Sequence, residues 1–242
     1  MKNTVFVLLV LMLYSCSTRI KSTISNTSFN ALEKTQEIII LEKGKLPEKS
    51  IFIGDLKIGD SGFTVDCDYN KVMNDAKIAA RKAGGNIIEI IELKDPNFGS
   101  TCYRLKAKIY RNFDAEKLSP IVQEFKERNK SRLPINADYA KVYFYRPSLV
   151  IGSLIGYKIR VNKDSVVCRV RNGEKCELTI TDFRKHKFWA KIDTKDSIVL
   201  DIKRGQEYFV RCSVGLGVFA GKPELNLMEN HKAIEEFEKM KD

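Results

Sequence analysis

The chain has 242 residues, of which 43% are hydrophobic and 30% are charged, and this usage is ordinary for a folded globular protein. After the first 15 residues, no stretch approaches the roughly 20 apolar residues that a membrane-spanning helix needs, which excludes a bundle of such helices. The formal net charge is +11, and we expect it to be spread over a solvated surface, because Lys and Arg alternate with acids along most predicted strands.

Residues 1–15 have the pattern of a lipoprotein signal peptide. Lys2 supplies a positive charge, residues 5–13 (VFVLLVLML) form an apolar run too short to span a bilayer, and Ser15 precedes Cys16. In lipoprotein maturation the peptidase cuts before the Cys, whose thiol carries a diacylglyceryl group and whose new amino terminus takes an acyl chain such as palmitate. The pattern therefore predicts lipidation at Cys16 and stable membrane attachment. The alternative is an ordinary signal that is cleaved elsewhere.

Residues 16–35 are predicted to be a flexible tether, because they are rich in Ser, Thr and Asn and show little apolar periodicity. A flexible chain of about 20 residues reaches roughly 25 Å, which places the folded body just off the membrane. No acidic residue follows Cys16 before Glu33, and we expect a periplasm-facing position on the outer membrane. Export also disfavours nucleic-acid binding despite the basic charge.

Residues 36–112 are predicted to form a small α+β domain. A run of apolar and alanine residues falls on one helical face and ends at Gly84-Gly85, and segments of alternating or β-branched residues flank it. In chain order we expect two strands within 36–60, a strand at 63–68, a helix over 72–83, and strands at 86–93 and 101–110.

The cysteine before this helix, the AARKAGGNIIEI passage and the closing CYRLKAKIY resemble the compact α+β fold of the outer-membrane stress-sensing lipoprotein of the Rcs phosphorelay and its relatives. Members of that group carry disulfides, and the resemblance implies a bridge here between Cys67 and Cys102. Such a bridge would close a loop of about 35 residues, and export makes it chemically allowed. The alternative is two buried thiols that do not meet.

Residues 113–136 are polar, hold two of the six prolines, and are predicted to be a linker. Ser119 followed by Pro120 is typical of a helix N-cap and first helical position, so we expect a short helix to about Lys130. We therefore expect two domains, one on each side of this linker.

Residues 137–242 are predicted to form an all-β, sandwich-like domain with a C-terminal helix. Short segments of strand character recur between turn residues at the spacing of a β-sandwich, and Asn230 is a plausible cap for the final helix. Strands are expected at 138–147, 158–161, 166–169, 176–180, 187–192, 198–202, 207–214 and 224–228.

The VYFYRPS opening, the following G-x-x-x-G-Y, the KRGQEYFVRCSVG strand with its GKPEL continuation and the terminal helix resemble a domain of unknown function, the DUF2846 family, that is common in bacterial lipoproteins. The resemblance implies a β-sandwich without assigned catalysis, and it brings no functional residues. Where that family more often has a Pro-Gly turn, this chain has TDFRKHKFWA at 181–190.

This basic and aromatic segment is the main candidate contact surface. Arg184, Lys185 and Lys187 lie beside Trp189 in the chain, and such a group suits lipid headgroups, anionic glycans or an acidic partner. The competing interpretation is a solvated turn in which Phe188 or Trp189 packs into the sandwich core.

The other cysteines and the two histidines form no recognised catalytic or metal motif. Cys168, Cys176 and Cys212 alternate with apolar residues and are expected to be buried thiols, with a Cys168–Cys176 bridge across the Asn-Gly turn as the alternative. No CxxC pair occurs, and His186 and His231, which we expect at the surface, have no nucleophile and carboxylate at a known spacing. We therefore predict no catalytic residue, no metal site and no cofactor.

Together these patterns favour a non-catalytic lipoprotein of the bacterial envelope, a binding or envelope-sensing module anchored through acylated Cys16. The expected partners are the membrane, through the lipid, and a protein of the envelope. Two alternatives are an enzyme that acts on cell-wall glycan or lipid and a structural subunit of an envelope complex.

Overall fold

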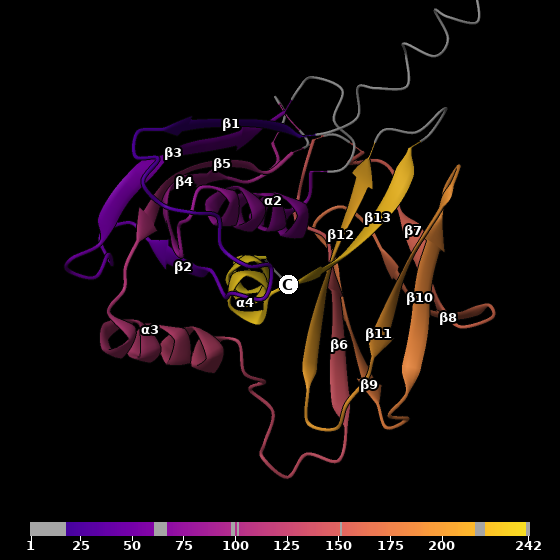
Figure 1. Cartoon of the computed structure of the whole chain (residues 1–242). Coiled ribbons are helices and arrows are strands. Elements are labelled where there is room, and N and C mark those ends of the chain that lie inside the picture. The colour runs from indigo at the N-terminus through magenta and orange to yellow at the C-terminus, as the bar shows by residue number, and fades with distance from the viewer. Residues whose placement is uncertain are drawn as a thin grey trace, which may run out of the picture. The chain divides into compact units, whose positions relative to one another are not determined.

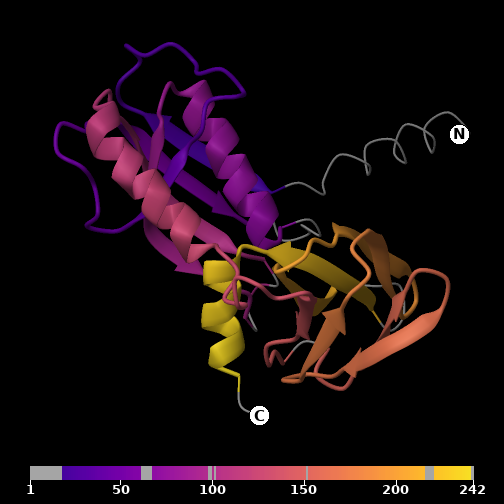
Figure 2. The same ribbon diagram turned by 90° about the horizontal axis from the view of Figure 1, so that it is seen from below.

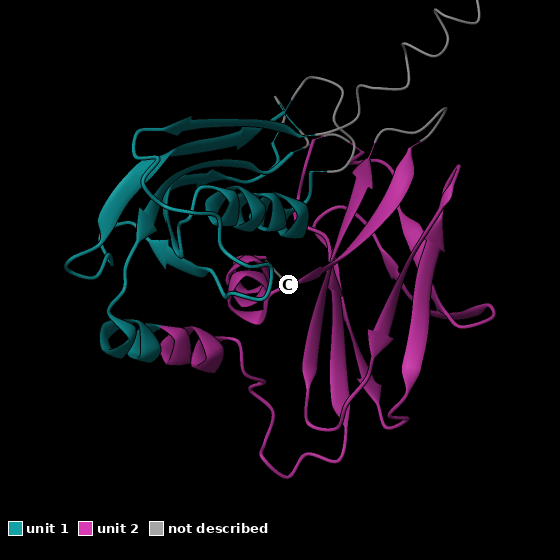
Figure 3. Cartoon of the chain, viewed as in Figure 1, with its two compact units in different colours: residues 1–121 teal, residues 122–242 magenta. Residues whose placement is uncertain are grey.

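A computed structural model describes residues 18–60, 67–97, 100, 102–150, 152–215 and 221–240. These residues form three β-sheets and three helices, one of them near the C-terminus, so the fold is mainly β (Figure 1). The chain divides into two compact units, residues 1–121 and 122–242 (Figure 3). Cys16 and residues 63–66 of a predicted strand lie outside the described residues.

The first unit is built on a five-stranded sheet in the order β1-β3-β5-β4-β2 (Figure 1). The β1–β3, β3–β5 and β4–β5 pairs are antiparallel, and β2 pairs with β4 in parallel. Helix α2 (Tyr69–Lys82) lies across one face of this sheet (Figure 2). The strands are β1 (Arg19–Ile24), β2 (Ile39–Glu42), β3 (Ile51–Gly59), β4 (Ile87–Lys94) and β5 (Arg104–Arg111).

Helix α2 confirms the helix predicted from its apolar face. The side chain of Asp68 caps its first turn by accepting a hydrogen bond from the Lys71 backbone N–H at 2.8 Å. Val72 and Ala76, one turn apart, are fully buried against the sheet. Gly84 has φ of +82°, a left-handed conformation that glycine adopts without strain, and it ends the helix.

Strand β1 corrects the flexible tether predicted over residues 16–35. It pairs with β3 along its whole length, from Arg19 opposite Gly59 to Ile24 opposite Gly54. All six of its side chains are exposed. An edge strand of this kind has no buried face, so the period-two apolar signal that identifies a strand in a sequence is absent.

Two further features hold β1 in place. Gly54 allows the close approach of the two backbones, because a Cβ atom at that position would lie 2.3 Å from the Thr23 carbonyl oxygen. Just before the strand, the buried Thr18 hydroxyl donates to the carboxylate of Asp75 on α2 at 2.7 Å. The chain is therefore fixed to the first unit from residue 18 onward.

Helix α3 (Ala115–Arg128) begins earlier than predicted. The carboxylate of Asp114 accepts a hydrogen bond from the Lys117 N–H at 3.2 Å, which is the bond of a helix cap. The predicted Ser119 cap is therefore wrong, and Pro120 lies inside the helix.

The second unit contains two four-stranded sheets, in the orders β11-β10-β7-β8 and β13-β12-β6-β9. Their inner faces share one apolar core that includes the fully buried Phe144, Ile159, Phe188 and Val210. This arrangement is a β-sandwich. The strands are β6 (Ala140–Tyr145), β7 (Tyr157–Val161), β8 (Ser165–Val170), β9 (Lys175–Ile180), β10 (Lys185–Lys191), β11 (Lys195–Asp201), β12 (Glu207–Gly215) and β13 (Lys222–Met228).

Helix α4 (Asn230–Glu238) covers the outer face of the β13-β12-β6-β9 sheet. The Phe237 ring lies edge-on to the rings of Tyr143 and Phe209, with centroids 5.3 and 6.0 Å apart. Asn230 is not the predicted cap, because Glu229 holds that position and the Asn230 side chain instead donates to the Asn129 carbonyl at 3.1 Å. One sheet of the sandwich is thus covered on both faces.

Two disulfides join cysteines of the same unit. Cys67 is bonded to Cys102 in the first unit, across a sequence separation of 35. Cys168 is bonded to Cys176 in the second, so the free thiols expected at these two positions are wrong. The strands β8 and β9 lie in opposite sheets, so two thiols that both face inward meet across the sandwich edge. Cys212 is free and buried, and burial raises the pKa of its thiol to about 12.

We predict that the chain beginning at Ser17, denatured without a reductant, binds one equivalent of an alkylating reagent, at Cys212. After reduction it should bind five, because both bridges open. Mass spectrometry of the labelled protein distinguishes these states. Three or five labels without reduction would contradict one or both disulfides.

Candidate functional site

The candidate functional site is the outer face of the β11-β10-β7-β8 sheet. Along β10, exposed and buried side chains alternate, as the pleat of a strand requires. Lys185, Lys187 and Trp189 point outward, whereas His186 and Phe188 point into the sandwich. Three predicted contact residues therefore share one face, Phe188 rather than Trp189 fills the core, and the surface position expected for His186 is wrong.

Neighbouring strands add more basic side chains to this face. The register places Arg169 opposite Lys158 and Lys191 opposite Lys195. Arg160 lies opposite Trp189 and carries an ion pair to Asp164 at 2.8 Å. We call the following residues the basic face: Lys158, Arg160, Arg169, Lys185, Lys187, Trp189, Lys191 and Lys195.

Trp189 is held at a defined position on the basic face. Its indole N–H donates to the Asn162 carbonyl at 3.2 Å, and Asn162 has φ of 53°, a left-handed conformation that Asn tolerates better than most residues. The Lys195 ammonium lies 3.9 Å from the centroid of the indole ring and the Arg160 guanidinium 5.0 Å. The ring is thus an ordered aromatic surface between two cations.

The basic face carries unfavourable contacts between like charges. Arg169 and Lys158 face each other across strands, as do Lys191 and Lys195, and like charges in such positions destabilise a sheet. In the part of the chain that the structure describes, Lys158, Arg169 and Lys191 have no acidic partner within ion-pair distance. A bound anionic group would relieve this repulsion.

The clustering also corrects the expectation that the positive charge is spread evenly. Along β7 and β10, whose sequences are YKIRV and KHKFWAK, basic residues alternate mainly with apolar ones rather than with acids. That alternation is the signal from which the basic face could have been found. Arg184, the fourth predicted contact residue, precedes β10 and forms an ion pair with Asp182 at 2.5 Å.

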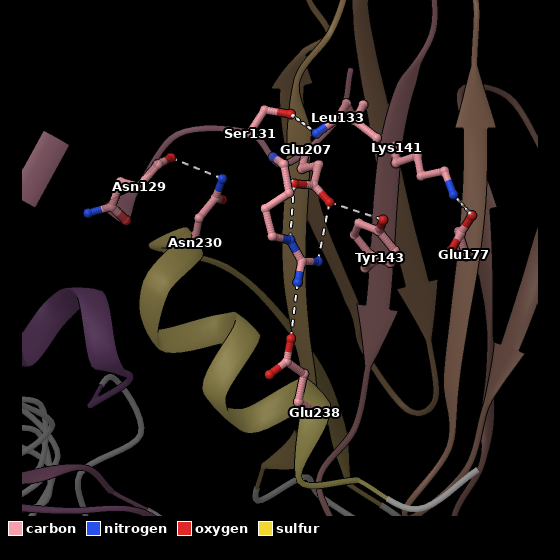
Figure 4. A network of polar contacts seen from close by, with 10 residues as sticks. Asn129, Ser131, Leu133, Lys141, Tyr143, Glu177, Glu207, Asn230 and Glu238 are labelled. Carbon is pink, nitrogen blue, oxygen red and sulfur yellow. Dashed lines mark hydrogen bonds and ion pairs between the residues drawn. The ribbon is translucent and has the colours of Figure 1, made fainter. Parts of the chain in front are cut away.

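A second polar network in the same unit has a structural role. Glu207, whose side chain is only 2% exposed, accepts hydrogen bonds from the Arg132 backbone N–H at 2.6 Å and from the Tyr143 hydroxyl at 3.1 Å (Figure 4). Arg132 also pairs with Glu238 on α4 at 3.1 Å. These contacts tie the segment before β6 and the final helix to one sheet of the sandwich, and burial raises the pKa of Tyr143.

Within the described ranges, no three His, Cys, Asp or Glu side chains are grouped so that they could hold a metal ion. No helix among these residues is long and apolar enough to cross a membrane. Comparison with protein-family models, with curated proteins and with solved structures finds no match. The candidate site therefore rests on its own geometry.

We predict that Glu207→Ala lowers the free energy of unfolding by about 2 to 3 kcal/mol, because it leaves the buried Tyr143 hydroxyl and the Arg132 N–H without their acceptor. Denaturant unfolding measures the change. Glu177→Ala is the matched control, since Glu177 is an exposed partner of Lys141 and should cost less than about 1 kcal/mol. Equal losses in the two variants would contradict the assigned role of Glu207.

Proposed function

We propose that the protein is a non-catalytic, lipid-anchored module of the bacterial envelope that binds an acidic envelope protein through the basic face. The observation that carries this proposal is the basic face itself, in which seven cations surround one ordered Trp. The acids on the same side of the sheet are Asp164, which pairs with Arg160, and Asp201, which lies opposite Lys185. Trp and Arg, which Trp189 and Arg160 supply here, are enriched among the residues that contribute most to binding at protein interfaces.

The two sheets of the sandwich differ in a way that supports this choice. Helix α4 covers the outer face of one sheet, whereas the outer face of the other carries exposed Lys185, Lys187 and Lys191. Beside them, Val199 is exposed by 57%. An exposed apolar side chain among cations gives a protein partner both a contact surface and a charge pattern to match.

The location in the envelope rests on the signal pattern before Cys16. The two disulfides support it, because such bonds persist mainly in oxidising compartments. We further propose that the two compact units are separate domains, a small α+β domain and a β-sandwich with a C-terminal helix. We also propose that the first of these domains is related to the Rcs sensor fold and the second to the DUF2846 family.

A photo-crosslinking amino acid at position 187, in cells, tests the binding proposal. We expect a covalent adduct with an acidic protein, and we expect Trp189→Ala to lower its yield about tenfold or more, as for the central aromatic residue of an interface. Position 203, an exposed lysine in a turn of the same unit, is the control and should give no such adduct.

Adducts that contain only lipid or glycan would contradict the proposal. So would an adduct whose yield is the same from positions 187 and 203, or is unchanged by Trp189→Ala.

A further inference from the structure

The exposed face of the first unit's sheet carries a row of three lysines. Lys21 of β1 lies directly opposite Lys57 of β3, and Lys57 lies directly opposite Lys106 of β5. We call these three residues the lysine row. Lys106 has an acidic partner, Glu92, at 2.6 Å, whereas Lys21 and Lys57 have none within ion-pair distance in the described part of the chain.

More cations lie on the same end of this face. Arg19 precedes Lys21 by two residues and therefore points to the same side of β1. Lys94 lies opposite Arg104 where β4 and β5 pair. Helix α2 covers the other face, on which Leu56 and Ile58 are buried. The acids on this side are Asp55, two residues before Lys57, and Glu92, which pairs with Lys94 and Lys106. Cations therefore outnumber acids at this end of the face, and the directly opposed lysines destabilise the sheet in water.

The lysine row lies at the end of the sheet where the chain enters the fold. Thr18 is fixed by its hydrogen bond to Asp75, and only two residue steps separate it from Cys16 in the sequence. At no more than about 3.6 Å per residue, the five residue steps from Cys16 to Lys21 span roughly 18 Å at most. That is about two Debye lengths at physiological ionic strength, so a charged surface that holds Cys16 acts on these lysines only where this end of the sheet lies on it.

We propose that the lysine row docks on the anionic phospholipid surface of the membrane into which the acyl chains of Cys16 insert. This inference rests on the lipid anchor of the proposed function and adds the face of the protein that meets the lipid. Phospholipid phosphates relieve the repulsion between Lys21, Lys57 and Lys106, and the short connection to Cys16 holds this end of the sheet beside them.

The test uses the chain from Ser17 to Asp242, which keeps every described residue and lacks the anchor. Vesicles of phosphatidylcholine with 30% phosphatidylglycerol, at about 50 mM salt, should bind it in sedimentation. Each unit of charge near an anionic surface changes partition about fivefold. Lys57→Glu changes the charge by two units and should therefore weaken binding about 25-fold. The same change places a carboxylate between two lysines and should raise the melting temperature.

Lys203→Glu is the matched control, because it reverses the charge of one exposed lysine of the second unit that lies outside the basic face. It should change vesicle binding by less than about threefold, because Lys203 is not part of the lysine row. If both variants lose vesicle binding equally, binding depends on the net charge of the protein, and the proposed docking face is wrong. No binding, or equal binding to pure phosphatidylcholine, would also overturn it.

The acyl anchor is measured independently of this assay. If the protein from cells carries no acyl chains but the Ser17–Asp242 chain still binds vesicles through Lys57, the proposed lipid anchor is wrong and the docking face stands. If the protein from cells is acylated but the Ser17–Asp242 chain does not bind anionic vesicles, the docking face is wrong and the lipid anchor stands.

Discussion

Two of the three sheets, β1-β3-β5-β4-β2 and β11-β10-β7-β8, are covered on one face only, and this constraint determines which side chains reach the surface. A β-strand turns alternate side chains to opposite sides, so burying Leu56 and Ile58 under α2 necessarily exposes Lys57 on the other side of β3. In the sandwich, burying Phe188 exposes Lys187 and Trp189 in the same way. In both units these exposed faces carry several Lys and Arg side chains, among them Lys21, Lys57 and Lys106 in the first unit and Lys187 and Lys191 in the second.

Repulsion between like charges on these faces lowers the stability of the folded protein. Like charges lie directly opposite one another between Lys21 and Lys57 and between Lys191 and Lys195, and each contact subtracts a few tenths of a kcal/mol from stability. The acids that would neutralise these rows are few or already paired, as Glu92 is with Lys94 and Lys106. Buried packing and two disulfides offset this loss, and binding to an anionic surface is the function proposed for each face.

Much of the fold could be predicted from the sequence, because most elements have one buried face. Strand β1 could not, since its side chains are all exposed and its pairing depends on the absence of a side chain at Gly54. The Cys168–Cys176 bond required knowing that β8 and β9 belong to different sheets. In the candidate site, Lys187 and Trp189 are close in the sequence and can be predicted together, whereas Lys158 and Lys195 reach the same face only through strand pairing.

We propose that an acylated Cys16 holds the first unit against the membrane. Intact-mass spectrometry of the protein extracted from the membrane fraction measures whether the acyl chains are there. The predicted mass is that of a chain from Cys16 to Asp242 that carries a diacylglyceryl group and an N-acyl chain. A mass without acyl chains, or a chain that begins at another residue, would contradict the claim.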